Sequence, residues 1–235
     1  MVISSKENEK FKTAKKLKEK KHRAQTGFCV VEGKKIINDL IKNKIKLIEE
    51  FIAGVNITEK LYKELTNTDG FAIFEVPKSI DYSGGRFIVC DNIQDAGNMG
   101  TICRTALAFG FGTIFNINSA DTFSEKVIRA SSGAVFNLNI IDITIQDFLN
   151  LFNTQKNKLG ITLYSANLNG KSLDAFENSA KNFGIILGSE GQGVSKELQA
   201  ASDATITIRM QNTLESLNVA VSAGIIMHKL SEGNK

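Results

Sequence analysis

The chain alternates short apolar runs with longer amphipathic segments along almost its whole length. Short runs rich in β-branched and aromatic residues predict strands, and segments with apolar residues three or four apart predict helices. In the first part of the chain, strands are expected over 28–31, 47–53 and 71–76, and helices over 5–22, 34–42 and 58–65.

This alternation is interrupted at the only proline, Pro77, and at the turn-like Tyr82-Ser83-Gly84-Gly85. We therefore expect a boundary here, with one domain over 1–80 and a second over 84–235. The second domain is predicted to contain strands over 87–91, 113–117, 137–141, 160–164, 183–187 and 204–208, and helices over 99–109, 123–131, 145–156, 195–201 and 216–230. Strands that alternate with helices indicate an α/β fold with a mainly parallel sheet covered on both faces.

Three segments of the second domain carry glycine and polar residues that a sheet or helix alone does not require. They are DNIQDAGNMGTICRTA at 91–106, LGSEGQG at 187–193 and ESLNVAV at 215–221. The first two follow apolar runs and precede helical patterns, so they are loops at the carboxyl ends of strands, where open α/β sheets bind ligands. The third opens a long helix, and free backbone N–H groups gather at a helix start.

In this order, the three segments resemble the three motifs of the SpoU/TrmH family of RNA ribose 2′-O-methyltransferases, which belongs to the SPOUT superfamily. Two positions depart from the family pattern, since Ala96 and Arg209 stand where prolines are usual. The resemblance implies S-adenosylmethionine as cofactor, a deep trefoil knot in the C-terminal part, and a homodimer with the cofactor pocket near its interface. The helix over 219–230, apolar on more than one face, is the expected contact surface. The first domain looks like the small α/β RNA-binding domain of many family members.

The resemblance also assigns roles to individual residues. The residues implied at the catalytic centre are Asn98, Arg104, Glu190, Ser216 and Asn218. Those implied to bind the cofactor are Leu187, Gly188, Gly191, Ile208, Met210 and Leu217. A guanidinium can hold an RNA phosphate in a two-pronged contact, so Arg104 is expected to position the substrate. It stays protonated, and the general base is left open.

Asn98 and Arg104 are six residues apart and are expected to face one point, with Glu190 fixing both. The alternatives are a surface arginine, an exposed acid near a helix start, and a simple helix cap formed by Ser216 and Asn218. A dinucleotide site is rejected because the glycine spacing is GxxGxG rather than GxGxxG. The segment over 165–172 ends like a nucleotide-binding P-loop but begins with serine.

Charge adds a candidate RNA surface near the N-terminus. The net charge is only +4, yet basic residues crowd one early segment. The candidates for RNA contact are Lys15, Lys16, Lys20, Lys21 and Arg23. A phosphate polymer would bind such a face with salt-sensitive affinity, although an ordinary solvated helix face has the same composition.

Composition excludes several other classes of site and location. Three scattered cysteines and two histidines form no local metal-binding or disulfide pattern, so no metal is expected. No apolar run approaches the roughly 20 residues of a membrane span, and the start lacks an apolar signal region. The sequence therefore predicts a cytoplasmic protein without a membrane partner.

These observations predict an S-adenosylmethionine-dependent RNA 2′-O-methyltransferase. Ribosomal RNA is favoured over tRNA because tRNA-specific relatives usually lack the N-terminal domain. The alternatives are a tRNA methyltransferase, or an RNA-binding or ribosome-assembly protein that has lost turnover. Base identity leaves no local signature, so the modified nucleotide stays open.

Overall fold

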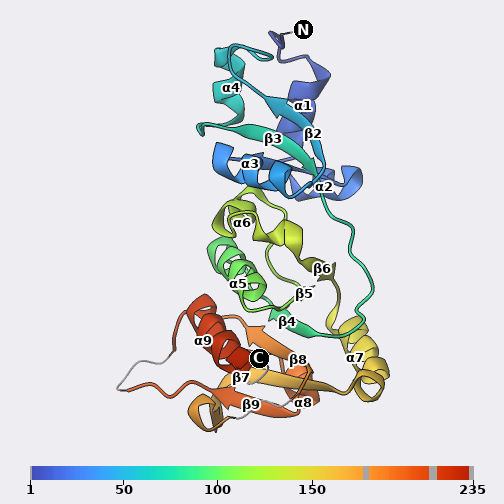
Figure 1. Ribbon diagram of the computed structural model, residues 1–235, viewed down its shortest axis with the longest axis vertical. Coiled ribbons are helices and arrows are strands. Elements are labelled where there is room, and N and C mark those ends of the chain that lie inside the picture. Colours follow the sequence, from blue (N-terminus) through green and yellow to red (C-terminus); the bar gives the residue numbers. More distant parts are fainter. Residues whose placement is uncertain (1, 177–179, 212–215, 233–235) are drawn as a thin grey trace.

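The computed structural model describes residues 2–176, 180–211 and 216–232 and contains two β-sheets (Figure 1). The first is antiparallel, in the order β1-β3-β2. Its strands are β1 (Phe28–Glu32), β2 (Leu47–Phe51) and β3 (Phe71–Glu75). The helices of this part are α1 (Glu9–Lys16), α2 (Lys20–Thr26), α3 (Lys34–Lys42) and α4 (Glu59–Leu65).

The second sheet is parallel throughout, in the order β6-β5-β4-β8-β7-β9. Its strands are β4 (Arg86–Asp91), β5 (Thr113–Ile117), β6 (Asn139–Asp142), β7 (Ile161–Ser172), β8 (Asn182–Gly188) and β9 (Ala204–Thr207). The connecting α-helices are α5 (Ala96–Ala108), α6 (Glu125–Ala130), α7 (Ile145–Leu159), α8 (Lys196–Ala201) and α9 (Val219–Ser231). Two 3-10 helices, η1 (Ala134–Asn137) and η2 (Leu173–Ala175), complete it. The predicted mainly parallel α/β architecture is confirmed.

Helices cover both faces of this sheet, as the alternation in β4 illustrates. Ile88 and Cys90 pack in the core beneath α5, α6 and α9, whereas Phe87 and Val89 pack in the core beneath α7 and α8. Figure 1 shows α5, α6 and α9 on one side of the strands and α7 on the other. A sheet buried on both faces holds its strand ends in fixed positions, which is what a site built on them requires.

Two predicted elements differ from the observed ones by more than a few residues at their ends. The helix expected over 5–22 is broken at Leu17 and Glu19, where Glu19 is extended and α2 begins anew. The break turns α2 so that the Arg23 guanidinium donates to the Leu17 carbonyl oxygen at 2.6 Å. The strand expected over 160–164 continues to Ser172, because its first part pairs with β8 and its second part with β9.

The two sheets share one hydrophobic core across the predicted boundary. Phe74 of β3 contacts Phe136 of η1 with ring centroids 6.1 Å apart, and the largest core cluster contains residues of both parts. Arg23, only 7% exposed, pairs with Asp121 of the second part at 2.5 Å. The division into 1–80 and 84–235 therefore separates two sheets that are packed together.

Burial also settles the state of the three thiols. Cys29, Cys90 and Cys103 are free and buried. Removal from water raises the pKa of Cys103 to about 12 and raises the pKa of Cys29 and Cys90 as well. Among the described residues, no helix is both long enough and apolar enough to cross a membrane.

Candidate cofactor and RNA site

A pocket of about 330 Å³ lies at the carboxyl ends of β8 and β9 and beside the middle of β7. Its walls come from residues 166–168 of β7, the loop after β8, the end of β9 and the start of α9. We call it the β8 pocket. Side chains and backbone from segments more than 50 residues apart in the sequence meet here, as expected at the carboxyl edge of a parallel sheet.

The loop after β8 is closed by a tight backbone contact. The N–H of Gly193 donates to the carbonyl oxygen of Ser189 at 2.8 Å. A Cβ atom on Gly188 would lie 2.1 Å from the carbonyl carbon of Gly193, whereas a Cβ on Gly191 would meet nothing within 4 Å. Gly188 is therefore required by the loop itself, and Gly191 is not required by packing.

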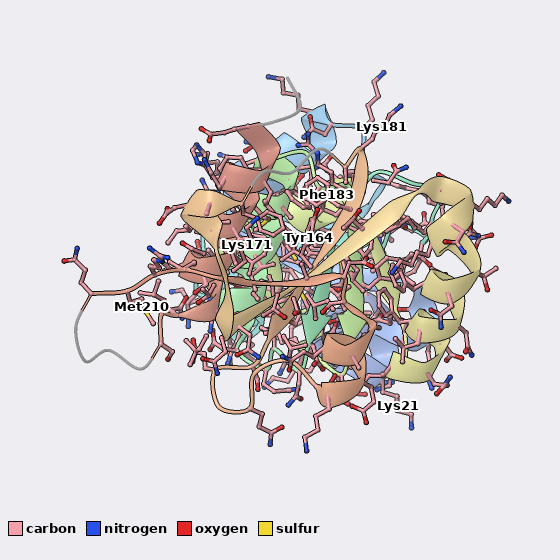
Figure 2. The ribbon with its side chains drawn as sticks, turned by 90° about the horizontal axis from the view of Figure 1, so that it is seen from below. Lys21, Tyr164, Lys171, Lys181, Phe183 and Met210 are labelled. Carbon is pink, nitrogen blue, oxygen red and sulfur yellow. The ribbon has the colours of Figure 1, made fainter. Side chains whose placement is uncertain are left out.

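All six residues predicted to bind the cofactor line the β8 pocket. They are Leu187, Gly188, Gly191, Ile208, Met210 and Leu217. Figure 2 shows Met210 on the chain that extends outward from the end of β9. Arg209, between two lining residues, is exposed and does not line the pocket. Its replacement of a family proline thus puts no charge into the pocket.

Three of the predicted catalytic residues form one hydrogen-bonded cluster beside this pocket. The Asn98 side chain donates to Glu190 Oε1 at 3.2 Å, and Asn218 Nδ2 lies 2.8 Å from the same oxygen and 2.9 Å from Asn98 Oδ1. The backbone N–H of Val219 also points to Glu190 Oε1, at 3.4 Å. The Glu190 carboxylate therefore joins the first, second and third motif segments.

Local capping explains how the sequence places this cluster. Asn98 follows Asp95, which caps α5 by accepting from the Asn98 N–H at 2.7 Å. Ala96 is the first residue of α5, where proline is tolerated but not needed. Asn218 caps α9 by accepting from the N–H groups of Ala220 and Val221.

The cap changes two expectations about the third motif. Helix α9 begins at Val219 rather than at 216, because Asn218 is its cap. Both ends of the Asn218 amide are engaged within the protein. Ser216 lines the pocket and is exposed, so of these two residues it is the one whose side chain can face a ligand.

Arg104 is not brought to the Glu190 cluster, contrary to the expectation from its spacing. Its guanidinium donates to Ser132 Oγ at 3.2 Å and lines a groove between α3 and η1. Six residues of α-helix turn a side chain by about 240° and advance it about 9 Å. Asn98 and Arg104 therefore lie on different sides of α5.

The candidate RNA-contacting residues divide into two groups. Lys15, Lys16, Lys20 and Lys21 are exposed on α1 and α2, although Lys15 pairs with Glu64 at 3.4 Å. Figure 2 shows Lys21 pointing away from the body of the molecule. Arg23 is instead buried in its pair with Asp121, so assigning it to the exposed basic face was wrong.

Sequence reasoning missed one wall of the β8 pocket. Ala166, Asn167 and Leu168 of β7 line it, within the segment whose end resembles a P-loop in sequence. Their signal is a strand that runs on beyond its pairing with β8, which no local pattern marks. Among the described residues, no cluster of three or more metal-ligating side chains is found.

Comparison with known proteins places these features in a wider group. The profile of the SpoU rRNA Methylase family matches residues 85–228, and that of the MRM3-like substrate binding domain matches residues 8–80. The 23S rRNA (guanosine(2553)-2′-O)-methyltransferase of Bacillus subtilis is 27% identical, over 97% of this chain and 98% of its own length. The 23S rRNA (adenosine(1067)-2′-O)-methyltransferase of Streptomyces azureus is 29% identical, over 76% of this chain and 68% of its own.

A solved structure is similar over nearly the whole length of both chains. The AdoMet-bound rRNA methyltransferase from Sinorhizobium meliloti superposes with a TM-score of 0.87 at 25% identity, covering 100% of this chain and 98% of that one.

Proposed function

Because the chain belongs to the SpoU rRNA Methylase family, we propose that it transfers a methyl group from S-adenosylmethionine to a ribose 2′-hydroxyl of ribosomal RNA. The observation that carries this proposal is the β8 pocket with the Asn98–Glu190–Asn218 cluster on its rim. The proposal includes an rRNA substrate, a division into domains over 1–80 and 84–235, and a cytoplasmic location, where rRNA is modified in bacteria.

The residues of the β8 pocket fit S-adenosylmethionine. The bound cofactor would supply an electrophilic methyl group on a sulfonium. Leu187, Ile208, Met210 and Leu217 offer apolar surface for an adenine ring, and the loop over 188–193 offers backbone polar groups, with open space beside Gly191. Ser216 offers a hydroxyl to the more polar parts of the cofactor. A pocket of this size and mixed lining is typical of small-molecule sites.

The chain's own contribution to methyl transfer is alignment. The Glu190 carboxylate, held by three donors, fixes the loop after β8 against the starts of α5 and α9. The Arg104 guanidinium, supported by Ser132, holds a phosphate of the RNA strand. Holding a nucleophile and a methyl group in line supplies a large part of the rate of such a displacement.

Two observations support rRNA over tRNA as substrate. The two named relatives act on 23S rRNA, and the first of them matches this chain end to end. Solved structures of tRNA-modifying relatives cover only 64% of this chain. The N-terminal part, which matches the MRM3-like substrate binding domain, would then serve rRNA binding through the exposed lysines of α1 and α2.

The proposal also includes a homodimer formed through α9. Its inner face is buried against α5 and the sheet, whereas Val221 and Ile225 on its outer face are 52% and 40% exposed. Leu107 of α5 is 38% exposed. Exposed aliphatic side chains on packed helices favour a self-complementary contact. Light scattering that found only monomer at micromolar concentration would overturn this part.

The proposed function is tested with purified protein and unmodified 23S rRNA transcripts. We expect titration calorimetry to show S-adenosylmethionine binding, and 2′-O-methyl mapping to show one modified nucleotide. Methyl transfer should persist in a chelator under conditions that keep the RNA folded. Binding of RNA without binding of S-adenosylmethionine would instead identify a protein that has lost turnover.

A further inference from the structure

A second pocket, of about 780 Å³, lies beside the first at the carboxyl ends of β4 and β5. The two pockets share Gln192 and Gly193 as a common wall. The second pocket lies near the boundary between the two halves of the sheet, where β4 of the β6-β5-β4 half pairs with β8 of the β8-β7-β9 half. Ligands of open parallel sheets bind in the crevice at such a switch point. We call it the β4–β5 pocket.

The lining of the β4–β5 pocket suits a flat, uncharged ligand with polar edges. Asn92, Asn118, Gln146 and Gln192 bring side-chain amides, and Ile117 and Ile143 bring apolar surface. An amide presents a donor and an acceptor side by side, which matches the edges of nucleobases, while aliphatic side chains cover a base face. Lys196 adds one cation to the lining.

The backbone of both asparagines is in the left-handed region, and a hydrogen bond joins their side chains. Asn92 and Asn118 have φ of 58° and 44°, in the left-handed region. Gln94 donates to Asn92 Oδ1 at 2.9 Å, and Asn118 Nδ2 donates to the same oxygen at 3.1 Å. Within the described part of the chain, Asn92 Nδ2 and Asn118 Oδ1 keep no partner, so one donor and one acceptor remain for a ligand.

A buried hydroxyl in the pocket wall also lacks a hydrogen-bond partner among the described residues. Ser195, which also lines the pocket, has a buried Oγ with no hydrogen-bond partner among the described residues. Its backbone N–H is fixed by the Asp91 carboxylate at 2.7 Å. An unpaired buried hydroxyl is unfavourable, so the wall of the pocket at Ser195 holds a polar group that the described part of the chain leaves unsatisfied.

From this arrangement we propose that the β4–β5 pocket binds a nucleobase of the RNA at or next to the nucleotide whose ribose is methylated. The inference rests on the proposed function and adds to it the place where the base is read. It agrees with the two named relatives, one of which acts on a guanosine and the other on an adenosine. A family that shares ribose chemistry but differs in target base needs base contacts beyond its cofactor site.

Asn118→Gly tests the proposal, because glycine adopts a φ of 44° without strain and only the amide is lost. Gln146→Ala, at an exposed position of α7, is a second variant should the first fold poorly. Asn153→Ala, which removes an exposed amide elsewhere on α7, is the matched control. The substrate is an RNA stem-loop that carries the nucleotide mapped on 23S rRNA, or guanosine 2553 if none is mapped. It is used intact, and in versions that lack one base at or beside that nucleotide.

We expect Asn118→Gly to lower kcat/KM for the intact stem-loop about tenfold, and to lose the wild-type sensitivity to removal of one base. Its S-adenosylmethionine affinity and the activity of Asn153→Ala should be unchanged. The proposal would be overturned if both pocket variants kept full activity, or if Asn118→Gly bound S-adenosylmethionine more weakly. It would also be overturned if, at every position tested, the loss in kcat/KM from Asn118→Gly and the loss from removing the base were simply additive. If the wild type transfers no methyl group, the proposed function fails. The pocket is then tested by RNA dissociation constants, measured for wild type and Asn118→Gly with the intact stem-loop and with the stem-loop that lacks one base.

Discussion

Gly188 and Gly191 stand three residues apart in one loop, yet the structure gives them different roles. A side chain on Gly188 would collide with the backbone of Gly193 and Val194, while Gly191 faces open space. We expect Gly188→Ala to displace the loop and weaken S-adenosylmethionine binding by more than about tenfold, since the cost of overpacking is typically 1–3 kcal/mol. Gly191→Ala should bind within about twofold of wild type, because its Cβ meets nothing.

Titration calorimetry measures both variants, and circular dichroism verifies that each is folded. Equal losses in the two variants would mean that the bound cofactor occupies the space that is open beside Gly191, so that the loop needs both glycines for binding. Sequence reasoning identified both glycines but could not separate them, because the collision depends on how residues 188 and 193 approach in space.

Arg104 is proposed to act through RNA binding and not through cofactor binding. Its guanidinium lies away from the β8 pocket, against Ser132. We expect Arg104→Ala to lower methyl transfer at least about 100-fold through lost positioning, with S-adenosylmethionine affinity unchanged. Arg209→Ala, an exposed arginine next to the pocket, is the control and should keep its activity. Near-normal turnover by Arg104→Ala at saturating RNA would make Arg104 a surface residue.

At the scale of elements, α1 and α2 form a basic face whose lysines are not equivalent. Lys16, Lys20 and Lys21 have no ion-pair partner among the described residues, whereas Lys10, Lys12 and Lys15 each pair with a glutamate. We expect replacement of the unpaired three by alanine to weaken RNA binding and lower the salt slope by about 2, at 0.7–0.9 per lost phosphate contact.

Filter binding between about 50 and 200 mM salt measures the slope. Alanine at the three paired lysines is the control, and it should change the slope less because those ammonium groups already face carboxylates. If the two triple variants behave alike, RNA contacts this part of the molecule through its overall charge and not through one set of lysines.

Most elements could be predicted from periodicity, within a few residues at their ends. The exceptions have long-range causes. The break between α1 and α2 accompanies burial of Arg23 against Asp121, nearly 100 residues away, and β7 is extended by its partner β9. The site residues were found because their motifs are local, whereas the β7 wall of the β8 pocket and the orientation of Arg104 depend on tertiary packing.

The Arg23–Asp121 pair joins helix α2 of the N-terminal part to the loop after β5 in the second part. We expect Asp121→Asn to lower the free energy of unfolding by about 3 kcal/mol, because it leaves a buried guanidinium without its counter-charge. Glu49→Gln breaks the more exposed pair with Lys10 and should cost under about 1 kcal/mol. Urea denaturation measures both. Similar midpoints for the two variants would show that Arg23 is not effectively buried in solution.

The position of β4 in the sheet has a consequence for how the chain folds. Its neighbours are β5, which follows at once, and β8, whose Phe183 pairs with Arg86. All strands of the first sheet come from residues before 76. In the second sheet, by contrast, the central strand β4 pairs with β8, which begins at Asn182. Since such distant pairing is slow to form, the N-terminal part can be complete on the ribosome while the second sheet still lacks half its strands. The segments that line the β8 pocket all follow residue 165, so under the proposed function a nascent chain would complete its substrate-binding part before its cofactor pocket.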